Sequence, residues 1–198
     1  MFSGIVESQA RVLHFNSRDE SVYRLIIQRP KEIGELRLGE SIALNGVCLT
    51  LSDQTKSELA FDVGPETLRV TGWGPDLVGC SLNLEKSLQW GDRVHGHLVT
   101  GHVDVTASVL RIREGTLWRE LTIDLPHNLS PLVWKKGSIS VNGVSLTVNQ
   151  VDSESFTVCL IPETLKRTNL GLVQPGDLVL LEADNMARGL QRLREVEL

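Results

Sequence analysis

The residues of this sequence most able to do chemistry are Cys48 and His102, because each marks a difference between two otherwise similar segments. Residues 41–50 are repeated 97 positions later as residues 138–147, and seven of the ten residues are identical. Within this repeat Cys48 is replaced by Ser145, and at the same shift His102 stands in place of Ile5. A thiolate is a far better nucleophile than a hydroxyl at neutral pH. Cys48 is therefore a candidate nucleophile and His102 a candidate functional histidine.

Three histidines, His95, His97 and His102, lie close enough in the sequence to suggest a metal site. On a strand His95 and His97 would share one face, and His102 would take the other. No suitably spaced carboxylate completes a set of ligands. We therefore expect no metal, and a junction between two domains that carries one functional histidine, His102.

Hydroxyl side chains recur at matching places in both copies of the repeat. A single hydroxyl on a strand often bonds locally or faces water, but six in register favour two polar pockets for a ligand rich in hydrogen-bonding groups. Lys136 stands where the first copy has Gly39, and is either a surface lysine or a charge directed at a ligand. The six hydroxyl residues are Ser41, Thr50, Thr67, Ser138, Thr147 and Thr164.

The elements that must position these residues also occur twice. A repeat of nearly a hundred residues exceeds a solenoid unit of about 20–50 residues, and each copy can close a core of its own. Short alternating or β-branched runs, separated by Gly, Pro and Asn-Gly, predict six antiparallel strands per copy in a barrel or sandwich. We expect domains at 1–97 and 98–184. Each contains one short helix, at the Pro-Glu-Thr-Leu segments 65–68 and 162–165.

The Asn-Gly pairs of the repeated segment interrupt apolar runs. At 45–46 and at 142–143 they favour a tight turn or a bulge. Backbone geometry is a sufficient reason for both pairs to be kept.

Composition narrows the class of protein. The net charge of −5 offers no basic stripe for nucleic acid. We find neither an apolar run long enough to span a bilayer nor the basic flank and apolar core of a signal peptide at the start. Three cysteines without C-x-x-C spacing suggest neither a disulfide framework nor a zinc site. These features predict a cytoplasmic protein with no nucleic-acid or membrane partner.

The C-terminal segment 185–198 differs from the rest of the chain. Met186, Leu190 and Leu193 have helical spacing, and Asp184 or Asn185 would be the N-cap. An apolar stripe on a short helix is stable only when it is buried. The helix therefore either covers its own barrel or, as we favour, associates with copies of itself.

Five segments of the chain together resemble riboflavin synthase of the alpha-chain type. The resemblance covers essentially the full length, and the motifs occur in order within the duplication. They are Met-Phe-Ser-Gly-Ile-Val-Glu at 1–7, Asn-Gly-Val-Cys-Leu-Thr at 45–50, Gly-His-Leu-Val-Thr-Gly-His-Val-Asp at 96–104, Asn-Gly-Val-Ser-Leu-Thr at 142–147 and Ile-Pro-Glu-Thr-Leu at 161–165.

The resemblance implies two closed six-stranded β-barrels and a C-terminal helix that assembles a homotrimer. It also implies a dismutation without a cofactor, in which two molecules of 6,7-dimethyl-8-ribityllumazine react and one donates a four-carbon unit to the other. The products are riboflavin and 5-amino-6-ribitylamino-2,4-pyrimidinedione. Each barrel would bind one lumazine, and the N-terminal barrel of one subunit would face the C-terminal barrel of its neighbour. Two departures from the family pattern bear on the trimer: the C-terminal helix region, which ends at Leu198, is short for the family, and Gly189 interrupts the helix at a cost near 1 kcal/mol.

The resemblance also implies the site residues. Cys48 or Ser41 would activate one substrate at the N-terminal site, His102 would transfer a proton, and Asp184 would have an accessory role near the junction. The N-terminal pocket would use Gly4, Ile5, Val6, Ser41, Cys48, Leu49, Thr50, Asp62, Val63, Gly64, Pro65, Glu66 and Thr67. The C-terminal pocket would use Gly101, His102, Val103, Lys136, Ser145, Leu146, Thr147, Ile161, Pro162, Glu163, Thr164, Leu165 and Lys166.

Two other classes of protein compete with a synthase. A non-catalytic lumazine or flavin carrier shares the fold, but both copies here keep their binding motifs, and Cys48 is present. A tandem barrel of the flavoprotein-reductase kind would need a nucleotide-binding domain with a Gly-rich turn, which this sequence does not contain. We therefore favour the enzyme.

Overall fold

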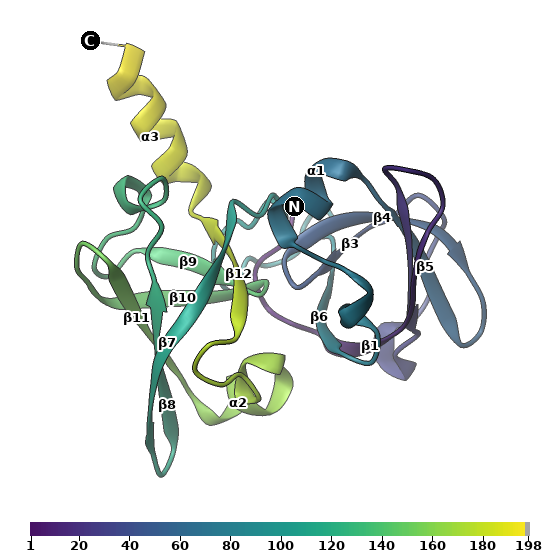
Figure 1. Ribbon diagram of the computed structural model, residues 1–198, viewed down its shortest axis with the longest axis horizontal. Coiled ribbons are helices and arrows are strands. Elements are labelled where there is room, and N and C mark those ends of the chain that lie inside the picture. The colour runs from purple at the N-terminus through teal and green to yellow at the C-terminus, as the bar shows by residue number, and fades with distance from the viewer. Residues whose placement is uncertain (197–198) are drawn as a thin grey trace.

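The chain forms two closed barrels that lie side by side, with a helix extending from the second (Figure 1). The computed structural model describes residues 1–196. Both barrels have the same strand order once the second is numbered from its own start, β1-β2-β5-β4-β3-β6 and β7-β8-β11-β10-β9-β12. The predicted fold of two six-stranded antiparallel barrels with a short C-terminal helix is confirmed.

The elements of the two barrels correspond one to one. The N-terminal barrel consists of β1 (Ser8–Ser17), β2 (Tyr23–Gln28), β3 (Ser41–Leu44), β4 (Val47–Gln54), β5 (Glu58–Val63), α1 (Pro65–Thr71) and β6 (Ser81–Lys86). The C-terminal barrel consists of β7 (Val105–Gly115), β8 (Trp118–Asp124), β9 (Ser138–Val141), β10 (Val144–Val151), β11 (Ser155–Leu160), α2 (Pro162–Arg167) and β12 (Leu178–Ala183). Helix α3 (Asn185–Val196) follows, and 3₁₀ turns lie at Lys31–Ile33, Pro75–Leu77, Ser130–Leu132 and Asn169–Gly171.

Each barrel is filled by the inward side chains of its strands. In β4 the residues Val47, Leu49 and Leu51 are buried in the barrel core, while the residues between them are half-buried or exposed. This alternation is the period of two that a half-buried strand requires. Because the barrel interiors are packed with aliphatic and aromatic side chains, ligand-binding side chains must lie on the outer faces.

The Asn-Gly pairs form tight turns, as predicted. Asn45 and Gly46 have φ of 46° and 83°, and Asn142 and Gly143 have 46° and 77°, which are the positive values of a two-residue hairpin turn. The turns of the two barrels meet: a Cβ added to Gly46 would lie 2.9 Å from the backbone nitrogen of Gly143. Glycine is thus required both by the turn and by this close approach.

The three α-helices begin as the sequence predicted. Pro65 and Pro162 occupy the first turns of α1 and α2. Of the two candidate N-caps for α3, the structure selects Asp184, whose Oδ1 accepts a hydrogen bond of 3.0 Å from the amide of Met186. Helix α3 runs through Gly189 without interruption.

The apolar stripe of α3 does not cover the barrel. Met186, Leu190 and Leu193 are 72, 67 and 63% exposed, and Figure 1 shows the helix (yellow) extending away from the C-terminal barrel. Only Ala187 of this helix is buried. The alternative that α3 covers its own barrel is therefore wrong for these three residues.

We predict that Gly46→Ala destabilises the protein more than Gly39→Ala. Both glycines have positive φ, but Gly39 has no atom within 4 Å of an added Cβ. Gly39→Ala should therefore cost only backbone strain, about 1–2 kcal/mol, whereas Gly46→Ala adds an overlap with the second barrel worth about 1–3 kcal/mol. Urea denaturation of both variants measures the difference, and equal losses would mean that the two turns separate freely.

Candidate active site

The catalytic candidates of the N-terminal barrel lie on its outer face. Ser41 pairs with Thr50, and Ala43 pairs with Cys48, across strands β3 and β4. Thr50 is exposed, and Ser41 and Cys48 are half-buried. The Cys48 side chain packs against a small buried cluster of Phe2, Ala43 and Val99. A nucleophile placed here could meet a ligand lying on the barrel wall.

Three predicted binding residues on the strands point the other way. Leu49 and Val63 are buried in the core of the N-terminal barrel, and Leu146 in that of the C-terminal barrel. Their side chains fill the barrels, so only their backbones face the surface that carries Cys48 or Ser145.

The segments that precede the first strands are exchanged between the barrels. The amide of Cys48 donates a 2.9 Å hydrogen bond to the carbonyl of Gly101, and the amide of Ser145 donates one of 2.8 Å to the carbonyl of Gly4. Phe2 and Val99 connect the two crossing segments by an antiparallel bridge. Each segment therefore completes the outer face of the opposite barrel.

Core packing agrees with this exchange. Val6 belongs to the core cluster of the C-terminal barrel, and Val103 packs against that of the N-terminal barrel. The prediction that grouped Gly4–Val6 with Cys48, and Gly101–Val103 with Ser145, is therefore wrong. His102 directly follows Gly101, whose carbonyl accepts the bond from the Cys48 amide, and Ile5 directly follows Gly4, whose carbonyl accepts the bond from the Ser145 amide.

Two buried carboxylates, which sequence reasoning did not single out, hold the exchanged segments. Glu85 on β6 accepts hydrogen bonds from the amides of Ser3 and Gly4, and Glu182 on β12 accepts them from the amides of Thr100 and Gly101. Burial raises the pKa of Glu85, and these donors oppose the rise. The repeated Leu-Glu pairs at 84–85 and 181–182 were the available signal.

His97 is a third residue whose place sequence reasoning did not predict. Its Nδ1 lies 2.7 Å from the hydroxyl of Ser145, so it belongs to the C-terminal face. Within the part of the chain that the structure describes, its Nε2 is buried without a hydrogen-bond partner. Desolvation lowers the pKa of His97, against the opposing charges of Asp184 and Glu182.

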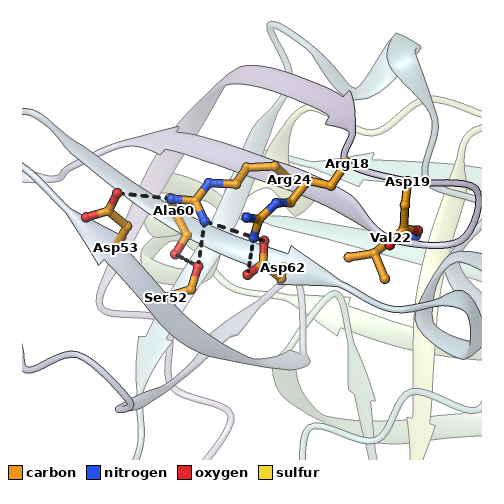
Figure 2. A network of polar contacts seen from close by, with 8 residues as sticks. All are labelled: Arg18, Asp19, Val22, Arg24, Ser52, Asp53, Ala60 and Asp62. Carbon is orange, nitrogen blue, oxygen red and sulfur yellow. Dashed lines mark hydrogen bonds and ion pairs between the residues drawn. The ribbon is translucent and has the colours of Figure 1, made fainter.

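Asp62 lies within a charged network that is particular to the N-terminal face. Figure 2 shows Arg18 and Arg24 directed at this carboxylate. One nitrogen of Arg18 is 3.0 Å from each Asp62 oxygen, and Arg24 also contacts Ser52 and Asp53. The network holds the Asp62 carboxylate in one orientation, although exposed pairs of this kind add little stability.

The equivalent place in the C-terminal barrel has different chemistry. Cys159 on β11 is the counterpart of Asp62 on β5. It pairs with Glu120 on β8, whereas Asp62 pairs with Arg24 on β2. Lys136 has a φ of 69°, in the left-handed region that Gly39 occupies with 89° in the other copy. A lysine tolerates this conformation only at a cost in strain, and its amide still bonds to the carbonyl of Val148, as Gly39 does to Leu51. The structure leaves its side chain exposed.

The remaining predicted residues surround the first turns of the short helices. Glu66 forms an ion pair with Arg69, and Glu163 with Arg167, so both carboxylates have partners on their own helices. The hydrogen bond with Arg69 lowers the pKa of Glu66. The others lie at or beside these turns and are half-buried or exposed, namely Gly64, Pro65, Thr67, Ile161, Pro162, Thr164, Leu165 and Lys166.

Both outer faces are open rather than enclosed. Thr50 and Thr147 are exposed, and Ile5 and Ile161 are 44 and 58% exposed. A cleft of about 600 Å³ between the barrels is lined by other residues, Asn45, Trp73 and Asp177 among them, and by none of the predicted site residues. A ligand on either face would need a further surface to exclude water.

Comparison with known families defines the class of protein. A family model described as the lumazine binding domain matches the chain twice, at residues 3–87 and 100–184. The chain is thus a protein of two tandem lumazine-binding domains, one for each barrel. None of the described helices is long and apolar enough to cross a bilayer.

Full-length relatives identify the family more closely. The chain is 40% identical to riboflavin synthase of Chlamydia pneumoniae, over 93% of this chain and 90% of that protein. It is 38% identical to riboflavin synthase of Mycobacterium tuberculosis, over 98% of both chains. A crystal structure of LumP complexed with riboflavin superposes with a TM-score of 0.86 at 26% identity, and covers 93% of this chain and 100% of that chain. The chain belongs to the riboflavin synthase family, whose members are transferases.

We predict that His97 makes stability depend on pH. Because the pKa of His97 is lowered in the native state from the usual 6.5, the unfolded chain binds this proton more readily. The free energy of unfolding should then fall as the pH is lowered through 6.5 towards the native value.

Urea denaturation between pH 7.5 and 5.5 checks this expectation. His97→Gln should flatten the profile, while the same change at the exposed His14 should leave it as in the unmodified protein. An unchanged slope in His97→Gln would contradict the assignment.

Proposed function

We propose that this chain converts two molecules of 6,7-dimethyl-8-ribityllumazine into riboflavin and 5-amino-6-ribitylamino-2,4-pyrimidinedione, without a cofactor. The observation that carries the proposal is the exchange of segments, because it brings Gly101 and the adjacent His102 to the face of Cys48. A candidate nucleophile and a candidate proton-transfer group are then on one ligand face. The relatives named riboflavin synthase support the reaction class.

Each outer face is proposed to bind one lumazine. On the N-terminal face Ser41, Thr50 and Asp62 offer hydrogen-bonding groups on three neighbouring strands. On the C-terminal face Ser145 and Thr147 offer them, and His97 orients the Ser145 hydroxyl through its Nδ1. The solved LumP structure with 6,7-dimethyl-8-(1'-D-ribityl) lumazine, at 25% identity and a TM-score of 0.83, supports a lumazine as ligand of this fold.

The two faces are proposed to have different roles. A nucleophile adds to one lumazine, and a base removes a proton from the acidic methyl of the other. Cys48, or Ser41 near it, is suited to the first step at the N-terminal face. His102, on the same face, is suited to the proton transfer from the second lumazine, which the C-terminal face of a neighbouring subunit would hold opposite. Asp184 has a structural task as the cap of α3, and its charge also acts on His97, which fits an accessory role. Holding both rings together makes the step effectively intramolecular, worth up to roughly 7–11 kcal/mol.

Assembly into a homotrimer would supply the missing cover for each face. The exposed stripe of Met186, Leu190 and Leu193 on α3 supports self-association. Arg188 pairs with Asp104 and so fixes the direction of the helix relative to its barrel. We retain the division into domains 1–97 and 98–184 and an oligomerisation segment at 185–198, of which residues 197–198 lie outside the part of the chain that the structure describes. Cys48, Cys80 and Cys159 are unpaired in the described chain, which fits a reducing cytoplasm.

The activity of the purified protein on 6,7-dimethyl-8-ribityllumazine alone tests the proposal. Riboflavin should appear at half the moles of lumazine consumed, as followed by absorbance without added metal or cofactor. Tight binding without conversion would mean a carrier instead of an enzyme.

Within that assay we predict that Cys48→Ser loses activity far more than binding. The hydroxyl keeps the polar atom but is a poor nucleophile at neutral pH, so kcat should fall by about 10²-fold or more while lumazine affinity stays within a few fold. Cys80→Ser, at an exposed cysteine outside both faces, is the matched control. If kcat is unchanged in Cys48→Ser, then Cys48 does not take part in the reaction.

We further predict that Leu190→Asp combined with Leu193→Asp dissociates the oligomer. Sedimentation equilibrium should show a trimer for the unmodified protein and a monomer for the double variant, because two charges cannot be buried in an apolar helix interface. Activity should fall with the loss of assembly. Arg192→Asp, on the same helix but outside the stripe, should remain a trimer; a monomeric unmodified protein would refute the assembly.

A further inference from the structure

The buried carboxylates of the two barrels make the same set of contacts. Glu182 accepts hydrogen bonds from the amide and hydroxyl of Thr100, at 2.7 and 2.6 Å, and from the amide of Gly101 at 3.0 Å. Glu85 accepts the equivalent bonds from Ser3, at 2.7 and 2.9 Å, and from Gly4 at 3.0 Å. The residues Glu85 and Glu182 are 6 and 2% exposed. Each glutamate thus holds the segment that leaves its own barrel.

The segment held by each glutamate ends against the other barrel. The carbonyl of Gly101 accepts the bond from the Cys48 amide, and a Cβ added to Gly101 would lie 2.4 Å from the Cβ of Cys48. A Cβ on Gly4 would lie 2.5 Å from that of Ser145. No residue larger than glycine therefore fits at position 101, between Glu182 and β4, or at position 4, between Glu85 and β10. A short rigid connection therefore runs from Glu182 to Cys48, and an equivalent one from Glu85 to Ser145.

We propose that Glu182 and Glu85 are positioning residues that act across the junction, each fixing the loop that completes the ligand face of the opposite barrel. The consequence rests on the proposed function: Glu182 positions His102 beside Cys48 and so serves the chemical step, while Glu85 positions Ile5 beside Ser145 and so serves binding at the other face. Each glutamate acts through its bonds to this loop, to Ser3 and Gly4 or to Thr100 and Gly101.

A carboxylate is the group that suits this task. It accepts all three hydrogen bonds and brings no donor of its own. Glutamine at the same place has one acceptor oxygen, so its amide would oppose a backbone N–H and leave that buried donor unpaired. Glu182→Gln and Glu85→Gln therefore change the side-chain volume little, but each should loosen the segment that the glutamate holds.

The reactivity of the Cys48 thiol reports on the release directly. In the full-length protein, iodoacetamide labelling followed by peptide mass spectrometry measures Cys48 against Cys80 and Cys159 as internal standards. Glu182→Gln should accelerate the labelling of Cys48 about tenfold, the factor expected from one unpaired buried amide, and leave the other two cysteines unchanged. Glu85→Gln, the matched control, should leave Cys48 within about twofold of the unmodified protein.

The reciprocal experiment uses a thiol introduced by Ser145→Cys. Its labelling should accelerate in combination with Glu85→Gln and not with Glu182→Gln. If both glutamine variants accelerate both thiols, or neither accelerates any, the carboxylates only stabilise the fold and the proposal is overturned. Should Glu182→Gln fail to fold, Thr100→Val removes one of the three bonds and should raise the labelling of Cys48 alone.

The kinetic parameters kcat and KM distinguish a positioning role of the glutamates from a purely stabilising one. Glu182→Gln should lower kcat by about tenfold or more with little change in KM, since small displacements of a catalytic group are costly. Glu85→Gln should chiefly raise KM. Equal changes of both parameters in both variants would overturn the assignment to separate faces. Because labelling needs no substrate, a protein without synthase activity would still test the positioning.

Discussion

The hydrogen bonds from the amides of Cys48 and Ser145 to the carbonyls of Gly101 and Gly4 are the contacts on which the rest of the structure depends. They require that each leading segment leave its own barrel and lie on the other. Once this exchange is made, the two barrels share their packing, since Val6 enters one core and Val103 packs against the other. Neither proposed ligand face is complete within a single barrel.

A network of asparagines fixes the junction at a second place. The side-chain nitrogen of Asn83 donates to the carbonyl of Asn142 and to Oδ1 of Asn169, and Asn169 donates in turn to Oδ1 of Asn45. Buried amides must find partners or lose the free energy of desolvation. Because these partners come from both barrels, a shifted docking would leave several amides unpaired. The network therefore specifies one relative arrangement of the barrels.

The duplicated scaffold carries unequal faces. The charged network around Asp62 has no counterpart at Cys159, and the Cys48 thiol is matched by the hydroxyl of Ser145. Two identical substrates that play different parts need this combination of a common shape and different side chains. The buried glutamates preserve the common shape, so the differences can be confined to the ligand faces.

The sequence by itself determined the duplication, the two barrels, the Asn-Gly turns and the candidate nucleophile, because each depends on local patterns. Alternating apolar residues specify strands, Asn-Gly specifies a hairpin turn, and a cysteine opposite a serine can be found by aligning the two copies. The same comparison indicated His102, which the family resemblance then assigned to the pocket of the wrong barrel.

Only the tertiary structure decided which barrel each leading segment completes. A segment can pack on its own barrel or on the other with the same local sequence. The choice is made by backbone bonds between residues far apart in the chain, Cys48 with Gly101 and Ser145 with Gly4. For the same reason the sequence did not show the contacts that Glu85, Glu182 and His97 make. Their partners are backbone amides and a hydroxyl brought together by the closed barrels, and such contacts leave no periodic signal in the chain.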